Sequence, residues 1–497
     1  MYGSPALLMH FRMRIGGKLE RLQSWSQQHA ALVVSGVVLL GYLIYLPLTD
    51  YTKLYFDAGG YWQGAKSYYG TGRFAFFSFF QQRGYLFSLL LAPFTKLEQT
   101  YGWVPLRITR LLGASVAAAV FGWAGPALWQ AVRGGAPIPL GRRLLFAALG
   151  FLLWRDYFNF SLTDFPALLA LSIALVSLLR GRGLASALLA GAAVAAAANM
   201  RPVYQAALPA VGLLTLLPPL GRAWWWGGAR TATLLLGAAL VLWPQLKSND
   251  DHLGIRSPWV ITSLPSQPNL YLKQLEWGLQ MQKYETSVAS DYPMAQMRFE
   301  DKRGQALFQA TGLAEFTEPH QYLELCLGRP WRAGGVWLRH LFNGLDVQYA
   351  SPYIQEVFTP TWALAWLNYS LIWGGLFVLL VRRWQRPTSG WVRPVLVLMA
   401  LLVPCAATLP TAIECRFLLP LHLLLMAAVA FGAAPLRWWQ QATRRGRTAL
   451  VVSYVAVVVA GFSASASSQS HLAIIPRDLL NDLPLRSIAP APAAQPW

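Results

Sequence analysis

The stretch DYTKLYFDAGGYWQGAKSYYGTGRFAFFSFFQQRGY, residues 50–85, is polar, aromatic and rich in glycine, and it closely follows the first long apolar run, residues 30–48. It carries two acidic residues, Asp50 and Asp57. An apolar run of that length predicts a membrane-spanning helix, so both carboxylates are expected at the edge of a membrane. Acidic residues in such places pair with cations or belong to a site. Whether these two carboxylates belong to a site therefore depends on which other residues of the chain lie at the same membrane edge.

The composition indicates a multi-pass membrane protein. Of the 497 residues, 55% are hydrophobic and 12% are charged, whereas ordinary globular proteins carry about 25% charged residues. Most of the net charge of +20 comes from short basic clusters between apolar runs, which is the pattern of cytoplasmic membrane loops rather than of a nucleic-acid-binding surface. The three cysteines, Cys326, Cys405 and Cys415, form neither a disulfide framework nor a metal-ligand pattern.

The apolar runs predict an all-α polytopic fold with about 11 transmembrane helices. Residues 1–29 are expected to be a basic cytoplasmic N-terminus, and residues 30–48 a retained signal anchor, because no cleavage site follows. A transmembrane module is expected over residues 30–246, with its first outer loop over residues 49–104. Within that loop, residues 86–94 are too short to span and are expected to form a re-entrant or interfacial segment broken by Pro93. Transmembrane helices 8–11 follow over residues 359–463, and residues 464–497 form a partly disordered outer tail.

The segment 247–358 differs from the rest of the chain. It holds 12 of the 21 acidic and 10 of the 41 basic residues, so it is slightly acidic in a strongly basic chain. Residues 269–284 and 298–310 have helical spacing, and residues 322–345 are amphipathic. We expect a small, mainly helical domain that is inserted on the outer, periplasmic side, away from the basic loops.

With the spans placed, ionisable residues gather at the outer edge of the membrane, where unpaired charge is costly. The residues in this group are Asp50, Asp57, Arg83, Asp156, Asp164, Arg201, Asp250, Asp251, Glu414 and Arg416. For Asp156, Asp250 and Asp251 we expect ordinary ion pairs or solvated acids. His422, which falls inside an apolar run, is expected to be a buried histidine with satisfied hydrogen bonds.

Five motifs follow one another in the chain: FDAGGYWQGAKSYYGTGRF (56–74), RGYLFSLLLAPFTKLEQTYGWVPLRITRLLGASVAAAVFGWA (83–124), SLTDFPALLALSIAL (161–175), WPQLKSNDDHLG (243–254) and TAIECRFLLPLHLLL (411–425). Together they resemble the GT-C superfamily of integral membrane glycosyltransferases, in particular the aminoarabinose- and mannosyl-transferase-like enzymes. These enzymes take a sugar from a polyprenyl-phosphate carrier. In the first motif, Asp57, Tyr61, Ala65 and Gly70 occupy the places of the family's acid, tyrosine, alanine and glycine.

The resemblance implies a glycosyltransferase acting on an acceptor hydroxyl of a glycolipid, polysaccharide or protein. Asp57 is expected as the general base, and Asp164 as a second catalytic acid that positions or tunes it, since two nearby carboxylates push one pKa upward. Guanidinium groups match phosphate oxygens, so the arginines are expected to bind the departing phosphate. The expected substrate-binding residues are Asp50, Tyr61, Arg83, Arg201, Glu414 and Arg416.

The sequence leaves the cofactor open. The family's first loop often carries two acids close together, but Ala58 and Gly59 follow Asp57 here. No cofactor is predicted with certainty, a divalent cation stays open, and its ligands are unknown. The expected partners are a polyprenyl-phosphate sugar donor, a glycan, lipid or protein acceptor, and membrane lipids, but no nucleic acid. The expected location is a bacterial inner membrane with the site facing the periplasm.

Two other functions stay open. A transporter or flippase of lipid-linked sugars would also have many spans and outer acids, but the hydropathy shows no internal repeat. An O-antigen ligase or polymerase favours a large outer loop with histidines and arginines. The segment 247–358 supplies candidates for it in His252, His320, His340, Arg329, Arg332 and Arg339.

In the first loop, the aromatic residues expected either to stack on a sugar or to anchor the loop are Tyr61, Trp62, Tyr68 and Tyr69.

Overall fold

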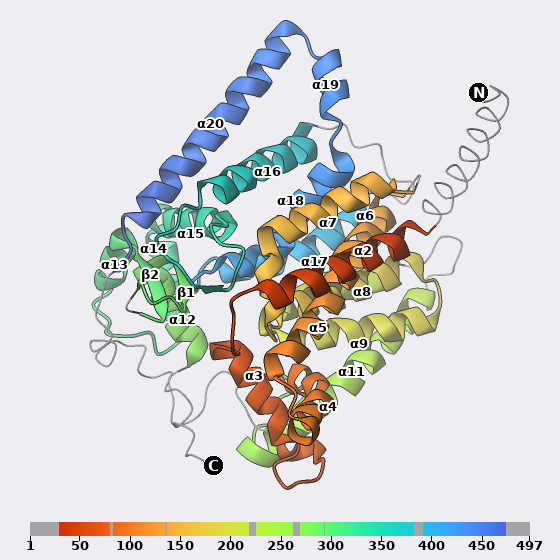
Figure 1. Cartoon of the computed structure of the whole chain (residues 1–497). Coiled ribbons are helices and arrows are strands. Elements are labelled where there is room, and N and C mark those ends of the chain that lie inside the picture. The colour runs from red at the N-terminus through yellow and green to blue at the C-terminus, as the bar shows by residue number, and fades with distance from the viewer. Residues whose placement is uncertain are drawn as a thin grey trace, which may run out of the picture.

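The computed structural model describes residues 29–79, 83–134, 137–217, 225–261, 269–292, 294–381 and 391–473. Within these residues the chain is mostly helical (Figure 1). Six described helices are long and apolar enough to cross a membrane, which fits a membrane-embedded protein. They are Ala30–Leu48, Pro105–Arg133, Trp225–Leu253, Trp362–Leu380, Cys415–Gly432 and Arg444–Gln469.

The N-terminal half forms the body of the bundle. Its helices are α2 (Ala30–Tyr45), α5 (Pro105–Ala117), α6 (Gly125–Arg133), α7 (Leu140–Trp154), α8 (Asp164–Arg180), α9 (Leu184–Met200), α10 (Leu208–Leu216) and α11 (Trp225–Leu253). Most of α8 is buried, and α9 packs against both α8 and α11. The alanine-rich sequence of α9 makes this close packing feasible, because small side chains let helix backbones approach in an apolar environment.

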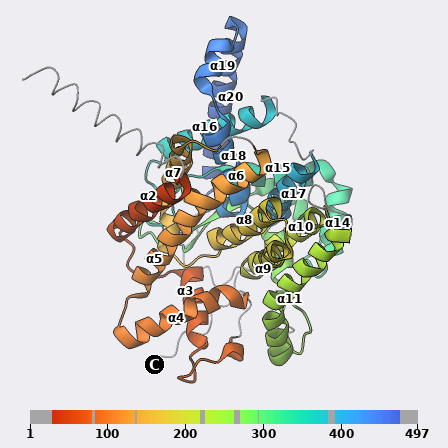
Figure 2. The ribbon, with the colours of Figure 1, turned by 90° about the vertical axis from the view of Figure 1, so that its right-hand side faces the viewer.

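The first loop folds into two helices, α3 (Phe56–Ser67) and α4 (Tyr85–Tyr101). Both lie together below the bundle in Figures 1 and 2. The predicted break at Pro93 is wrong, because α4 continues through this residue. The face of α4 that includes Tyr85, Ser88 and Ala92 is buried. Packing along that face offsets the backbone hydrogen bond that a proline inside a helix removes.

The segment after α11 contains a small sheet among helices. Its elements are α12 (Leu270–Gln280), β1 (Met281–Ser287), β2 (Gln296–Glu300), α13 (Lys302–Gln309), α14 (Pro319–Gly328), α15 (Pro330–Leu345) and β3 (Tyr353–Ile354). The strand order is β2-β1-β3, with β1 antiparallel to β2 and parallel to β3. The prediction of helix at residues 281–284 and 298–300 is wrong. In β2 and in the second half of β1, burial alternates residue by residue, which is the period of a strand rather than of a helix.

The C-terminal helices complete the described chain. They are α16 (Trp362–Val381), α17 (Val392–Thr408), α18 (Leu419–Ala427), α19 (Pro435–Gln441) and α20 (Arg444–Gln469). Helix α17 packs against α10 and α18, whereas α20 runs along α16 at the edge of the molecule (Figure 1). After α20, the chain pairs with β2, since the Ala473 backbone N–H donates to the Arg298 carbonyl at 2.8 Å. The tail was predicted to begin at residue 464, but α20 continues to Gln469. The part of the predicted tail from residue 474 onward lies outside the described residues.

Candidate active site

A cavity of about 610 Å³, here called the site cavity, lies where several helix ends meet α12 and the β1–β2 hairpin. Helices α3 and α8 begin beside it, and α9 ends beside it. Segments far apart in the chain thus meet at one end of the bundle. The charged residues in its wall are Asp57, Arg83, Asp164, Arg201, Glu414 and Arg416.

Asp57 is the most accessible of the three carboxylates, with 44% of its side chain exposed. It occupies the first turn of α3, where the helix dipole favours an ionised carboxylate. Arg83 Nη2 donates to Asp57 Oδ1 at 2.6 Å, and Arg83 Nη1 donates to the Asp57 carbonyl oxygen at 3.1 Å. The preceding residue, Phe56, has a φ of 36°, and a bulky residue accepts such a value only at an energetic cost. The chain therefore holds a strained backbone immediately before this carboxylate.

Arg416 joins the three carboxylates. Its Nη2 lies 3.5 Å from Asp57 Oδ2, its Nη1 lies 3.6 Å from Asp164 Oδ2, and its Nε donates to Glu414 Oε2. The side chain of Arg416 is 13% exposed, whereas those of Asp164 and Glu414 are 2% and 8% exposed. Asp164 and Glu414 thus lie behind Arg416, and Asp57 faces the open cavity.

Arg201 neutralises the innermost carboxylate. It forms an ion pair with Asp164, and its guanidinium lies 4.9 Å from the centre of the Phe417 ring. A guanidinium over an aromatic face is attracted by the ring's quadrupole. The acids and arginines predicted as catalytic or substrate-binding residues, except Asp50, therefore form one network of three guanidiniums and three carboxylates.

The pKa values of the acids diverge. Burial acts to raise the pKa of Asp57, but Arg83 and Arg416 outweigh it and hold that pKa below its ordinary value. Burial raises the pKa of Glu414 despite the opposing charge of Arg416. Glu414 Oε1 is also buried and has no hydrogen-bond partner among the described residues. The expected upward shift therefore falls on Glu414, and Asp57 stays ionised at neutral pH.

Close packing fixes Arg83 in this network. Its guanidinium lies 4.6 Å from the centre of the Tyr61 ring, so Tyr61 supports Arg83 while also lining the cavity. The next residue, Gly84, packs directly on α9, and a Cβ there would lie 1.8 Å from the Asn199 carbonyl oxygen. Only glycine permits this approach, which brings Arg83 to the end of α9.

Other predicted residues lie elsewhere. Asp50 is exposed and does not line the site cavity. Trp62 is buried and donates to Glu98 at 2.7 Å, and Tyr68 is buried and donates to the Tyr85 carbonyl at 3.1 Å. Tyr69 does not line the cavity either. Of the loop's aromatic candidates, Tyr61 alone borders the site.

The acids expected to be ordinary ion pairs are paired. Asp156 accepts a hydrogen bond from Tyr45 and lies near Arg155, and exposed ion pairs join Asp250 to Arg256 and Asp251 to Lys247. The prediction for His422 is confirmed. It is fully buried, accepts a hydrogen bond from Trp154, and contacts Asn368 Oδ1 at 2.8 Å.

Several residues that line the site cavity were not predicted. Tyr353 of β3 accepts a hydrogen bond from the Ala58 backbone N–H at 3.3 Å, directly beside Asp57. On α12, Gly278 packs so closely on the loop before Glu414 that a Cβ would lie 2.3 Å from the Pro410 carbonyl oxygen. The sequence signal for Phe417 is its place next to Arg416 in the last motif. For the others no local pattern exists. The unpredicted lining residues include Thr163, Gln274, Trp277, Tyr284, Tyr353 and Phe417.

The carboxylates do not form a metal-binding group. Among the described residues, no set of three or more His, Cys, Asp and Glu side chains could hold a metal ion. Both oxygens of Asp57 face guanidiniums, and Arg416 takes one oxygen of Glu414. Arranged in this way they do not fit a divalent cation, which would have to displace an arginine.

The arrangement can bind an anion and accept a proton. Arginines offer paired N–H groups to phosphate or carboxylate oxygens, and the half-exposed carboxylate of Asp57 can accept a hydrogen bond from a hydroxyl group in the cavity. Comparison of the chain with protein-family models finds no matching family, and comparison with curated proteins finds no match.

Proposed function

We propose that this chain is a GT-C type membrane glycosyltransferase that moves a sugar from a polyprenyl-phosphate carrier to an acceptor hydroxyl. The acceptor belongs to a glycolipid, a polysaccharide or a protein. The observation that carries the proposal is the half-exposed carboxylate of Asp57, held between Arg83 and Arg416 in a cavity that holds a third arginine. An anionic donor and a hydroxyl acceptor need this combination of cations and base.

In the proposed reaction, the acceptor oxygen attacks the anomeric carbon of the donor sugar. The bond between that carbon and the phosphate oxygen breaks, and polyprenyl phosphate leaves with the bonding electrons. Arg83, Arg201 and Arg416 stabilise the negative charge that develops on the phosphate. The proton of the acceptor hydroxyl passes to Asp57. A positioned general base of this kind contributes about 10²- to 10⁴-fold to the rate.

The two remaining acids, Asp164 and Glu414, have different proposed roles. Asp164 holds Arg201 and Arg416 in place and is itself 2% exposed, so its proposed role is positioning rather than contact with the substrate. Glu414 borders the cavity and has a raised pKa. A protonated carboxyl can donate a hydrogen bond, and we propose that Glu414 donates to a sugar hydroxyl. The low pKa of Asp57 makes it a weak but fully ionised base at neutral pH.

We infer a topology in which the site faces the outer side of the membrane. About 11 spans would place residues 49–104 and the inserted domain, residues 247–358, outside, and the basic loops inside. In support, α8 begins and α9 ends at the site cavity, as expected for consecutive antiparallel helices. A bacterial inner membrane with a periplasmic site remains the proposed location.

The two alternatives receive less support. The histidines of a ligase-like site do not converge: His340 is buried against the carbonyls of Leu409 and Met281, and His320 pairs with Glu318 on an exposed surface. A transporter site is expected near the middle of the bundle, whereas the charged residues of the site cavity lie at helix ends.

The test is a donor assay with purified protein in liposomes. The liposomes contain a polyprenyl-phosphate sugar with a radiolabelled sugar, together with a total lipid and glycan extract of the source cell envelope as acceptor. We expect release of polyprenyl phosphate together with label in the acceptor. The rate should be the same after EDTA treatment, because the carboxylates are occupied by arginines. Label that crosses the bilayer while still attached to its carrier would favour the transporter and contradict this proposal.

A further inference from the structure

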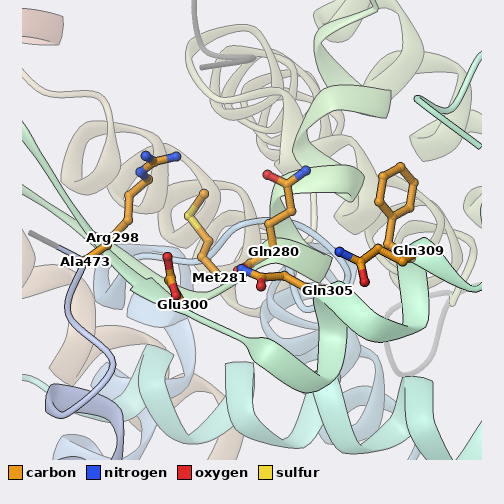
Figure 3. A pocket seen from close by; sticks show the side chains of 8 residues that line it. Gln280, Met281, Arg298, Glu300, Gln305, Gln309 and Ala473 are labelled. Atoms are coloured by element: carbon orange, nitrogen blue, oxygen red, sulfur yellow. The ribbon is translucent and has the colours of Figure 1, made fainter. Parts of the chain in front are cut away.

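A second cavity lies beside the β1–β2 hairpin, next to the site cavity. It measures about 380 Å³ and is formed by the end of α12, the hairpin, α13 and the segment that follows α20. Figure 3 shows three glutamine side chains at one side of it and Arg298 and Glu300 at the other. The residues that line it are Gln280, Met281, Arg298, Glu300, Gln305, Phe308, Gln309 and Ala473.

The second cavity and the site cavity share part of their walls. Met281 lines both. Along β2, Gln296 lines the site cavity, whereas Arg298 and Glu300 line the second cavity. Alternate residues of a strand share one face, about 7 Å apart, and all three are partly exposed. One face of the hairpin therefore leads from one cavity to the other.

The strand register extends this path. Thr286 pairs with Gln296 and Tyr284 pairs with Arg298, and both β1 residues line the site cavity. Arg298 thus lies directly across from a residue of the site cavity while its own side chain borders the second one. A chain of linked sugar units lying on this face would contact both cavities.

Polar groups in the second cavity have unused hydrogen-bonding capacity. Arg298 Nε is buried and has no hydrogen-bond partner among the described residues. A buried donor left without a partner costs free energy, which a ligand oxygen would recover. Gln305 donates through Nε2 to the Gln280 carbonyl at 3.1 Å, which holds the floor of the cavity in place.

We propose that this second cavity binds a neutral sugar unit of the acceptor glycan, beyond the unit that receives the transferred sugar. The inference rests on the proposed function. Side-chain amides donate and accept at once, so they suit the hydroxyl groups of sugars. Phe308 supplies an apolar surface for a sugar face. Arg298 and Glu300 balance each other, so the lining has no net charge and favours a neutral unit over a phosphate or an acid.

The test measures glycan binding without transfer. Detergent-purified protein, labelled with a fluorophore, is applied to a printed array of neutral and acidic oligosaccharides of one to six units. We expect binding to neutral oligosaccharides of two or more units. Arg298→Ala and Gln309→Ala should each weaken that binding about tenfold, the effect of losing about one charged or multiple neutral hydrogen bonds. Gln309 lies exposed on α13, so its replacement leaves the fold intact.

The matched control is Arg303→Gln. Arg303 is an exposed residue on the same helix and does not line the second cavity, so this variant should bind like the wild type. Glycan binding is measured in the absence of the sugar donor, which separates this inference from the proposed chemistry. Absence of glycan binding by the wild type, or binding as strong as that of the wild type by both cavity variants, overturns the inference even if the donor assay succeeds. Glycan binding with no donor turnover contradicts the proposed function alone.

Discussion

Two charged clusters lie close together in this molecule, and they differ in how far their side chains are exposed to solvent. The site cluster comprises Asp57, Arg83, Asp164, Arg201, Glu414 and Arg416 and opens on the site cavity. The sealed cluster comprises Lys283 and Glu285 of β1 and Asp346, which follows α15. In the sealed cluster the side chains are 1%, 7% and 0% exposed, whereas Asp57 is 44% exposed.

The difference shows that burial of charge alone does not indicate a reactive site. Asp346 accepts hydrogen bonds from Tyr369 at 2.7 Å, Gln348 at 2.7 Å and Ser465 at 2.9 Å. These contacts tie the end of α15 to α16 and α20, so the sealed cluster holds elements together. In the site cluster, by contrast, Asp57 presents a carboxylate to a cavity wide enough for a sugar. The predictions that follow test this division of roles.

The largest expected effect is on turnover by Asp57→Asn. An amide cannot accept the acceptor's proton as a carboxylate does, so the rate of polyprenyl-phosphate release should fall about 10²- to 10⁴-fold. The melting temperature in detergent should stay within a few degrees, because the side chain is half exposed. The matched control is Asp50→Asn, an exposed acid outside the cavity, which should turn over like the wild type. Wild-type turnover by Asp57→Asn would remove Asp57 as the base.

In the sealed cluster, Asp346→Ala should act on stability instead. The substitution removes the carboxylate that lies 3.6 Å from Lys283 Nζ. It also removes the acceptor of the hydrogen bonds that the Tyr369 and Ser465 hydroxyl groups donate. Breaking a buried ion pair in this way costs about 3–5 kcal/mol. Thermal unfolding followed by tryptophan fluorescence measures the loss. Asp250→Ala, which removes an exposed ion pair with Arg256, is the control and should change little. A fully stable Asp346→Ala protein would mean that this cluster does not hold α16 and α20.

Glu285 should make its own contribution to the pH dependence of stability. Burial raises its pKa from 4.5 to about 7, against the lowering effect of Lys283. A carboxyl whose pKa is raised by folding binds its proton more tightly in the folded state. Its stabilising contribution is therefore complete below pH 4.5 and is lost as the pH rises through 7, by about 3 kcal/mol.

Glu285→Gln should remove this dependence. The variant should melt near the wild-type temperature at pH 5 and above it at pH 8, because it no longer places a negative charge in the interior. Glu356→Gln, at an exposed position, should follow the wild type at both pH values. If Glu285→Gln lowers the melting temperature equally at pH 5 and pH 8, its charge is not what limits stability at high pH.

The sequence predicted the site cluster better than its surroundings. Charged residues at the ends of apolar runs fall on one side once the spans alternate, and this reasoning brought together Asp57, Arg83, Asp164, Arg201, Glu414 and Arg416, which the structure joins. Asp50 satisfied the same rule and yet lies outside the cavity. The position of a residue in the sequence indicates that it lies at the membrane edge, but it does not determine which way its side chain points.

The inserted segment shows where sequence patterns are insufficient. Tyr353 reaches the site through a two-residue strand that pairs with β1, and no local pattern marks so short an element. The strands β1 and β2 contain Gln, Lys, Glu and Arg residues whose burial depends on tertiary partners. The sealed cluster is the extreme case, because charged residues in a polar segment are expected on the surface. Their burial follows from ion pairs between distant elements.

The smallest expected effect, and the sharpest test of how the site cluster works, is Arg83→Lys. Lysine keeps the charge but cannot make both contacts with Asp57 or stack on Tyr61 in the same geometry, so kcat/KM for the donor should fall about tenfold, equivalent to about 1.4 kcal/mol. Because Arg83 helps to hold the pKa of Asp57 below its ordinary value against burial, the acid limb of the pH–rate profile should also move to higher pH. The exposed Arg73 of the same loop gives the control, Arg73→Lys, with unchanged values. A raised KM with an unmoved acid limb would assign Arg83 to phosphate binding alone. A shifted limb shows that Arg83 sets the protonation of Asp57, which is what separates this open cluster from the sealed one.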